Sequence, residues 1–319
     1  MGAFRFAPVL LAPGESADYI VLMGVENSRE EIQNLIDRYH TGRQIQKALE
    51  ETKSYWQNQV DIDFHTKEAG FDRLMKWVCF QPYLRRLFGC SFLPHHDYGR
   101  GGRGWRDLWQ DCLSLLLLNP EQVRSMITAN YEGVRMDGTN ATIIVSGNGS
   151  FIADLNGIAR VWMDHALWPL MTTRLYIDQT GDVELLNQEV PYFKDAQIMR
   201  GTDTDDLWDS THGDRQCTTG HTVYTGSILE HLLIQQLTSF YEVGSHNIFR
   251  LRGADWNDAL DMASEHGESV AFTCAYAGNL LDLAALIRLL DSHSSTHTAE
   301  LSEALTVLLE DDTETFDNI

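Results

Sequence analysis

The sequence predicts a mainly α-helical fold in which helices alternate with long polar loops. Apolar residues recur at the spacing of an α-helix over most of the chain beyond Phe64. The loops between these stretches are long and rich in Gly, Asp, Asn and Thr, whereas a compact four-helix bundle has short connections. This combination favours a helical toroid, in which the loops at the helix ends line one face.

The first residues differ from the rest of the chain. Residues 4–24 alternate apolar and turn residues, which predicts two strands joined by a turn at residues 13–15. Two strands do not make a domain by themselves. From Ser28 the pattern becomes that of a charged helix, with Glu31 as the capping-box partner of Ser28. We expect this region, up to about Gln59, to form a linker.

Eight further segments have the apolar spacing of a helix. They span residues 70–89, 106–118, 120–132, 156–180, 182–195, 222–242, 270–291 and 299–310. The polar loops between them include residues 91–105, 136–155, 198–221 and 252–268. Trp162 and Trp168, inside the helix expected at 156–180, are interpreted as core residues.

Composition narrows the class of protein. The chain has 319 residues, 43% of them hydrophobic, and a formal net charge of −22, which argues against nucleic acid and anionic membranes as partners. No segment reaches the roughly 20 apolar residues that span a bilayer. The five cysteines are an odd number and widely separated, so no disulfide framework is indicated. Without a signal peptide, this pattern predicts a cytoplasmic protein.

The most unusual stretch is H-D-Y-G-R-G-G-R-G-W-R-D-L-W-Q-D, from His96 to Asp111. It contains three arginines, three aspartates, four glycines and two tryptophans in sixteen residues. Glycines let the backbone approach a ligand closely, Arg and Asp form charged hydrogen bonds, and Trp lies flat against a ring. Such a combination suits a sugar.

The same stretch formally matches the dinucleotide motif G-x-G-x-x-G at residues 99–104. That motif follows an apolar strand and opens a βαβ unit, whereas here Pro94-His95-His96-Asp97 precedes it and only helices are expected after it. We therefore reject nucleotide binding. The remaining alternative is a Gly-rich loop whose arginines bond only to nearby carbonyls and carboxylates.

A second cluster, Gly253 to Asp261, places two carboxylates around a Trp-Asn pair. Asn257 or Asp258 could simply cap a helix that begins at residue 259. A functional interpretation is that Trp256 stacks on a sugar ring, while the apolar ring raises the pKa of Asp258 to suit a general acid.

Two groups of histidine and aspartate, at residues 95–97 and 212–221, lack the spacing of a recognised metal site. The acidic run at 203–209 lacks the Gly and the terminal Glu of a calcium loop. We therefore expect no metal.

Taken together, the two clusters resemble glycoside hydrolase family 94, the inverting disaccharide and oligosaccharide phosphorylases. The matching residues are R-G-G-R-G-W-R-D at Arg100–Asp107, followed by Gln110-Asp111, and D-W-N-D at Asp255–Asp258, with weaker support from H-A-L-W-P at His165–Pro169 and T-G-D at Thr180–Asp182. Within the family, the sequences of these motifs are most like those of the 1,2-β-oligoglucan phosphorylases.

The resemblance implies three parts. Residues 1–27 would be the end of an N-terminal β-sandwich domain, residues 28–63 a helical linker, and residues 64–319 a partial (α/α)6 barrel. This barrel would be the catalytic domain, truncated at its C-terminal side.

The resemblance also implies the site and the reaction. Arg100, Arg106 and Asp107 would hold the donor sugar, with Gln110 and Asp111 as further substrate contacts, Trp256 as the subsite wall and Asp258 as the general acid. The activity would be that of a hexosyltransferase, which cleaves a β-glucoside (β-1,2-oligoglucan or cellobiose-like) with inorganic phosphate to give α-glucose 1-phosphate. The expected partners are a β-linked glucose oligosaccharide and phosphate. A homodimer is a possible assembly, and no further cofactor is expected.

Two alternatives remain from the residues alone. An inverting hydrolase on the same toroid would need Asp107 or Asp111 to activate water about 6.5–9.5 Å from Asp258. A non-catalytic sugar-binding fragment is the other alternative. The family's phosphate-binding residues would lie beyond Ile319, so we expect this chain alone to be inactive.

Overall fold

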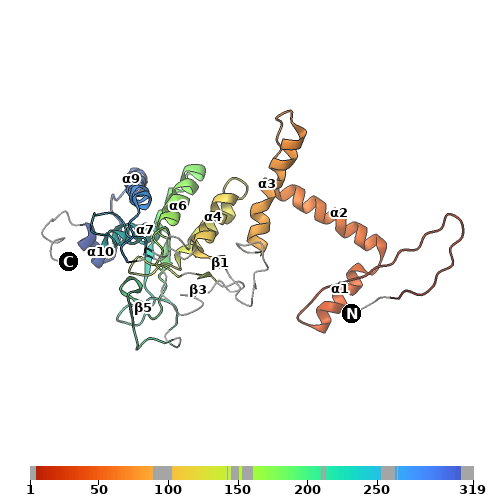
Figure 1. Ribbon diagram of the computed structural model, residues 1–319, viewed down its shortest axis with the longest axis horizontal. Coiled ribbons are helices and arrows are strands. Elements are labelled where there is room, and N and C mark those ends of the chain that lie inside the picture. The colour runs from red at the N-terminus through yellow and green to blue at the C-terminus, as the bar shows by residue number, and fades with distance from the viewer. Residues whose placement is uncertain are drawn as a thin grey trace. The chain divides into compact units, whose positions relative to one another are not determined.

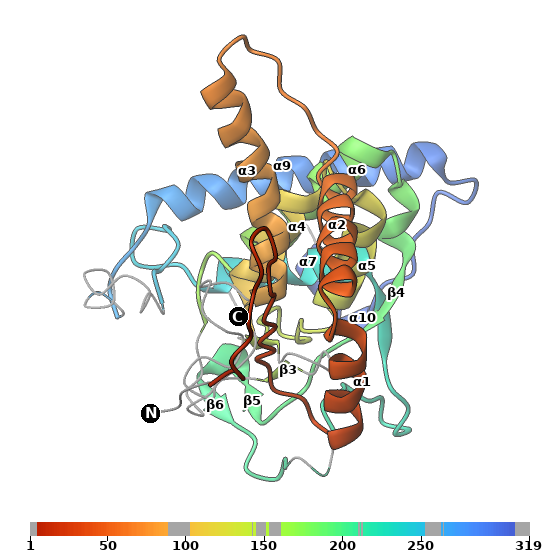
Figure 2. The same cartoon turned by 90° about the vertical axis from the view of Figure 1, so that its right-hand side faces the viewer.

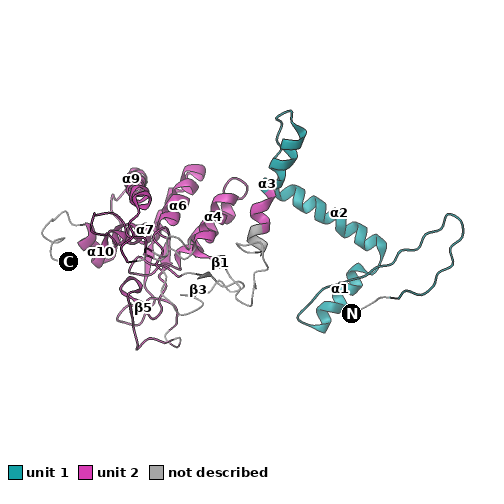
Figure 3. Cartoon of the chain, in the orientation of Figure 1, with its two compact units in different colours: residues 1–79 teal, residues 80–319 magenta. Residues whose placement is uncertain are grey.

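The computed structural model describes residues 5–88, 103–141, 143–144, 151–152, 161–209, 211, 213–252, 263 and 265–309. Of residues 85–88, 103, 143–144 and 151–152 it describes the backbone. The chain divides into two compact units, Met1–Cys79 and Phe80–Ile319 (Figure 3). Each unit is described by itself.

The first unit contains the helices α1 (Arg29–Tyr39) and α2 (Gly42–Gln59) and the first part of α3 (Ala69–Phe88) (Figure 1). The predicted N-cap is confirmed, because the Ser28 hydroxyl accepts a hydrogen bond from the Glu31 amide at 3.2 Å. The single helix expected from residue 28 to 59 is two helices. Thr41 has extended backbone and forms a capping box with Gln44, so a new helix begins there.

The strands predicted at residues 4–24 are wrong, since residues 5–27 contain no assigned strand. The turn between them does form, with the Glu15 amide donating to the Ala12 carbonyl at 3.0 Å. On either side of it, the rings of Phe6 and Tyr19 lie 4.4 Å apart. Two extended arms without a sheet to join are marginal as a hairpin, which explains why the alternating pattern gives no ladder here.

The second unit is built mainly of helices, as predicted. They are α4 (Trp105–Leu115), α5 (Pro120–Tyr131), α6 (Leu167–Thr180), α7 (Ile228–Thr238), α9 (Val270–His293) and α10 (Glu303–Leu309). Helix α6 contacts α4, α5 and α9 (Figures 1 and 2). The mainly α class is therefore confirmed, while the (α/α)6 arrangement stays a prediction.

Short strands join the loops of this unit. The antiparallel pairs are β1 (Arg103–Gly104) with β2 (Ile143–Ile144), β2 with β3 (Phe151–Ile152), β4 (Glu189–Pro191) with β7 (Thr225–Ser227), and β5 (Gln197–Ile198) with β6 (Asp203–Thr204). Three short 3-10 helices are η2 (Val183–Asn187), η3 (Met199–Gly201) and η5 (Ser239–Tyr241).

The helices differ most from the prediction at three places. Gly181 ends α6 in the left-handed conformation, with φ of 74°, and the segment after it forms η2 and β4 instead of a helix at 182–195. Ser227 caps α7 by accepting the Glu230 amide, so that helix begins at residue 228 rather than 222. Residues 162–166 form a turn closed by the His165 amide and the Trp162 carbonyl, and α6 therefore begins at residue 167.

A chain of five aromatic rings runs through the core of this unit. Trp105 lies 5.7 Å from Trp109 and Trp109 lies 5.0 Å from Tyr131, measured between ring centroids. Tyr131 is followed by His231 at 5.8 Å, and His231 stacks on Tyr192 at 3.7 Å. All five side chains are buried. This aromatic chain joins α4, α5 and α7 and fixes which face of α4 turns inward.

Helix α9 corrects one expectation from the sequence. By length and composition alone it could cross a membrane, with a mean hydropathy of 1.6 over its most apolar window, although no segment was expected to qualify. On one side it packs into the unit, where Tyr276 donates to the Met163 carbonyl at 2.6 Å. On the other side Val270 and Leu281 are exposed. Only 22% of the window is buried.

The Arg135–Asp195 pair is a buried ion pair whose two side chains are 5% and 8% exposed. It is bidentate, with Nε to Oδ1 at 2.9 Å and Nη2 to Oδ2 at 2.6 Å. By contrast, the Arg174–Asp178 pair on α6 is 29% and 47% exposed. Leaving one charge without its partner should therefore lower the free energy of unfolding more in the buried pair than in the exposed pair.

We expect Asp195→Ala to lower the free energy of unfolding by about 3–5 kcal/mol, because it leaves a buried guanidinium without its partner. The control Asp178→Ala should cost about 0.5 kcal/mol or less. Urea unfolding followed by circular dichroism measures both. Equal losses in the two variants would contradict the assignment of Arg135–Asp195 as a structural pair.

The histidine in the aromatic chain makes stability depend on pH. Burial lowers the pKa of His231 from 6.5 to about 4, although its hydrogen bond to the Ser227 carbonyl acts in the opposite direction. Below 6.5 the unfolded chain binds a proton that the folded chain does not bind until about 4. Stability is therefore lost as the pH falls through this window.

The free energy of unfolding falls by about 3 kcal/mol once the pH has passed through the whole window between the two pKa values. We expect His231→Phe, which keeps a ring against Tyr192, to show a shallower fall in the free energy of unfolding between pH 6.5 and 4. Urea titrations at several pH values measure the slope. A slope unchanged by the substitution would show that His231 does not carry this linkage.

Candidate carbohydrate site

Helix α4 separates its residues into two faces. The buried face consists of Trp105, Leu108, Trp109, Cys112 and Leu115. Arg106, Asp107 and Gln110 are partly exposed, and their spacing of one and four residues puts them on the opposite side of the helix. The structure thus brings together three of the residues predicted to bind substrate.

The other predicted residues have different positions. Asp111 is 0% exposed on α4, so it does not share the open face of Arg106, Asp107 and Gln110. Arg100, Trp256 and Asp258 lie outside the described residues.

The carboxylate of Asp107 lies close to Gly104. Gly104 is the N-cap residue of α4, and a Cβ atom at this position would lie 2.8 Å from the Asp107 Oδ2 atom. The carboxylate therefore folds back over the first turn of the helix, where a negative charge is favourable. A larger residue at 104 would require the Asp107 side chain to shift.

Arg106 is held on two sides. Its Nε atom donates to Asp164 Oδ2 at 2.5 Å, and its guanidinium carbon lies 5.2 Å from the centroid of the Trp162 ring, within the range of a cation–π contact. The same Asp164 oxygen accepts a hydrogen bond from Trp168 Nε1 at 3.1 Å. The side chain of Arg106 is still 21% exposed.

Trp162 and Asp164 are residues that the sequence analysis missed. Trp162 was interpreted as part of a helix core, and this is wrong, since it lies in the turn before α6 and faces a guanidinium. Asp164 directly precedes the H-A-L-W-P run that carried weak family resemblance. That run was the one signal that could have directed attention to this turn.

The charges of the turn are fixed by its surroundings. Burial raises the pKa of Asp164, but the hydrogen bond and charge of Arg106, together with His165, outweigh it and leave the pKa below its ordinary value. Burial lowers the pKa of His165 to about 4. His165 is therefore neutral near pH 7, while Asp164 is charged.

The neutral imidazole has an assignable tautomer. Its Nδ1 atom lies 3.1 Å from Asn140 Nδ2, which is a donor, so the hydrogen of His165 is placed on Nε2. The His165 carbonyl accepts from Trp105 Nε1 at 3.0 Å. The hydrogen bond from Trp105 attaches the turn to the beginning of α4.

The residue that precedes the second sequence cluster bonds to this turn. Arg252 forms an isolated antiparallel bridge with Trp162, and it is the last described residue before 253–262, the segment that contains Asp258. Trp162 in turn contacts Arg106. Trp162 therefore contacts both Arg106 of the first cluster and Arg252, the residue before the second.

Arg252 is also restrained from the other side. Its backbone is left-handed, with φ of 51°, and its Nη1 atom lies 3.4 Å from Glu242 Oε2. The other oxygen of Glu242 pairs with Arg200 at 3.2 Å, and the Arg200 carbonyl accepts from Arg252. This network fixes the chain where it enters the predicted acid segment.

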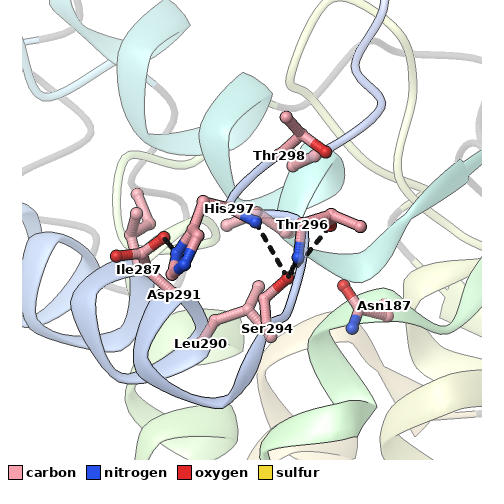
Figure 4. A pocket seen from close by; sticks show the side chains of 10 residues that line it. Asn187, Ile287, Leu290, Asp291, Ser294, Thr296, His297 and Thr298 are labelled. Carbon is pink, nitrogen blue, oxygen red and sulfur yellow. Dashed lines mark hydrogen bonds and ion pairs between the residues drawn. The ribbon is translucent and has the colours of Figure 1, made fainter.

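A separate pocket of about 360 Å³ lies at the end of α9 (Figure 4). Its walls come from η2, α7, α9 and residues 294–299, and its polar groups include Asp291 and His297, which pair at 2.8 Å. It contains none of the residues predicted to bind sugar. We therefore do not assign it to the site on α4.

The chain is similar to one known family and to several known proteins. Residues 55–204 match the family described as "Glycosyl hydrolase 94 superfamily, catalytic domain". N,N'-diacetylchitobiose phosphorylase of Vibrio furnissii is 23% identical over 287 residues, covering 82% of this chain and 32% of that protein. Solabiose phosphorylase of Paenibacillus borealis is 23% identical over 286 residues, covering 87% of this chain and 31% of that protein.

A third relative is named for a different activity. Cyclic beta-(1,2)-glucan synthase NdvB of Rhizobium meliloti (strain 1021) is 22% identical over 228 residues, which are 70% of this chain and 7% of that protein. The chain spans about a third of the length of the two phosphorylases that it matches. Over that part of their length, this chain is similar to the two phosphorylases, and its residues 55–204 match the catalytic domain of the glycosyl hydrolase 94 superfamily.

Proposed function

We propose that this chain belongs to the catalytic domain of an inverting phosphorylase, a hexosyltransferase that transfers glucose from a β-linked glucose oligosaccharide to inorganic phosphate. The observation that carries the proposal is the polar face of α4, where Arg106 is held against Trp162 and Trp162 bridges to Arg252, the described residue before the predicted acid segment. Two relatives named as phosphorylases support the reaction type.

In this proposal the acid is Asp258. It protonates the glycosidic oxygen as the bond from that oxygen to the anomeric carbon breaks, and a phosphate oxygen attacks the same carbon from the opposite face. The product is an α-sugar 1-phosphate. Inverting hydrolases need a second carboxylate to activate water, whereas phosphate is already an anionic nucleophile, so one acid is sufficient and no further cofactor is needed.

The donor sugar would lie against α4. Arg106 and Asp107, with Arg100, would bond its hydroxyls, Gln110 would add a further contact, and Trp256 would form the wall of the subsite. Arg and Asp are suited to this role because charged groups form the stronger hydrogen bonds to neutral hydroxyls. The fixed orientation of Arg106 supports this assignment, since less ordering is then needed on binding.

For the linkage, we favour β-1,2-linked glucose. The H-D-Y-G-R-G-G-R-G-W-R-D-L-W-Q-D and W-N-D-A-L-D stretches are more like those of 1,2-β-oligoglucan phosphorylases than those of cellobiose phosphorylases, and one relative carries β-(1,2)-glucan in its name. A hydrolase is less well supported, since the named relatives in the family include two phosphorylases. Of the two carboxylates considered for activating water, Asp111 is also 0% exposed.

The general test is whether sugar 1-phosphate forms. The polypeptide translated from the complete coding sequence is incubated with a β-1,2-linked glucose oligosaccharide, with and without phosphate, and glucose 1-phosphate is measured by a coupled assay. Release that requires phosphate supports the proposal. Release of free glucose without phosphate would indicate a hydrolase, and binding without turnover a non-catalytic sugar-binding chain.

We expect Asp258→Asn to lower turnover by about 10²–10⁴-fold, because general acid catalysis contributes about that much, while saccharide binding is retained. Asp261→Asn, a nearby carboxylate outside D-W-N-D, is the matched control and should keep most of the activity. Steady-state phosphorolysis and calorimetric binding measure the two effects. Wild-type turnover in Asp258→Asn would remove the acid assignment.

We expect Arg106→Ala mainly to raise the KM for the oligosaccharide, by roughly 10- to 100-fold, since a hydrogen bond to a charged group is worth about 1.5–3 kcal/mol. Arg124→Ala, which removes another partly buried arginine paired with an aspartate, is the control. Unchanged kinetics in Arg106→Ala would count against a role in the donor subsite.

A further inference from the structure

We infer that Asp164 is a positioning residue of the sugar site, which holds the guanidinium of Arg106 in the orientation that binds the donor. This inference rests on the proposed function and extends it to a residue outside the two motifs. Asp164 is 58 positions away from Arg106 in the sequence, in the turn that precedes α6.

The geometry of the contact is the first argument. Asp164 bonds to Nε of Arg106 at 2.5 Å, and Nε is the guanidinium nitrogen closest to the aliphatic chain. A bond at Nε restricts rotation of the guanidinium plane about its attachment to the chain. Trp162 restricts the same plane from its face, 5.2 Å from the guanidinium carbon. The two contacts therefore set the direction of Arg106 without requiring a ligand.

The second argument is the unsatisfied oxygen of Asp164. In the buried Arg135–Asp195 pair both carboxylate oxygens bond to the arginine. In Asp164, Oδ2 is shared between Arg106 and Trp168, while Oδ1 is buried with no hydrogen-bond partner in the structure. An unsatisfied buried acceptor costs free energy, so stability alone does not account for a carboxylate here.

The third argument is charge. Asp164 is anionic and His165 beside it is neutral near pH 7, so the adjacent imidazole does not compete with Arg106 for the carboxylate. The Asn140 amide bonds to Nδ1 of His165, and Trp105 of α4 donates to the His165 carbonyl. The turn is thus attached to α4 by a neutral hydrogen bond from Trp105 and by the ion pair with Arg106.

The chain offers a matched control for this arrangement. Arg124 Nε donates to Asp182 Oδ2 at 2.8 Å, and the Tyr176 hydroxyl donates to the same oxygen at 2.8 Å. One carboxylate oxygen is again shared by an arginine Nε and an aromatic side chain. These residues belong to α5, to α6 and to the N-cap of η2. They include none of the predicted sugar contacts, so they report the structural value of such a pair.

The experiment compares Asp164→Asn, Arg106→Ala, the double variant and Asp182→Asn. Affinity for a β-1,2-linked glucose disaccharide is measured by calorimetry, stability by urea unfolding, and phosphate-dependent release of glucose 1-phosphate by the coupled assay. A fifth variant, Asp164→Glu, restores the carboxylate on a longer side chain, which keeps the test usable if Asp164→Asn folds poorly.

We expect Asp164→Asn to weaken disaccharide binding by about 10- to 100-fold, the range for a misplaced binding group. Asp164→Glu should recover part of that loss, and Asp182→Asn should leave affinity unchanged. Because Asp164 acts through Arg106, the double variant should bind no more weakly than Arg106→Ala alone. A structural effect would instead add to that of Arg106→Ala.

Two results would overturn the inference: wild-type affinity in Asp164→Asn, or losses that add in the double variant. A wild-type protein that binds the disaccharide but forms no glucose 1-phosphate contradicts the proposed reaction only, and the affinities still decide the role of Asp164. A wild-type protein that binds no β-linked glucose disaccharide would overturn both.

Discussion

The burial of Trp105 and Trp109 is the constraint on which the site depends. Once these rings pack against Tyr131 in the core, the rotation of α4 about its axis is fixed, and Arg106, Asp107 and Gln110 must face away from the core. The aromatic residues of the motif thus act as anchors of the helix, and its charged residues occupy the open side.

The turn at residues 162–166 has an equivalent importance for the tertiary structure. It is bonded to α4 through Trp105 and Arg106, to α9 through Tyr276, and through Trp162 to Arg252, the described residue before the predicted acid segment. Residues with no obvious chemistry in the sequence therefore hold Arg106, whose chemistry was recognised.

Helical periodicity predicted α3, α4, α5 and α9 well, because the spacing of apolar residues follows from burying one side of a helix. The pairing of Arg106 with Asp164 was not predictable, since 58 residues separate them and only tertiary packing brings them together. The N-terminal strands failed for the complementary reason, since an alternating pattern forms a strand only where another strand is available.

The charge state of the turn has a consequence for kinetics. His165 is already uncharged well above a pKa of about 4, and Asp164 is already ionised below its ordinary range. Between about pH 5 and 8, where histidines usually change charge, these two residues therefore present a constant field to Arg106. Each limb of a bell-shaped rate profile in that interval would accordingly report another ionisation, such as that of the acid or of phosphate itself.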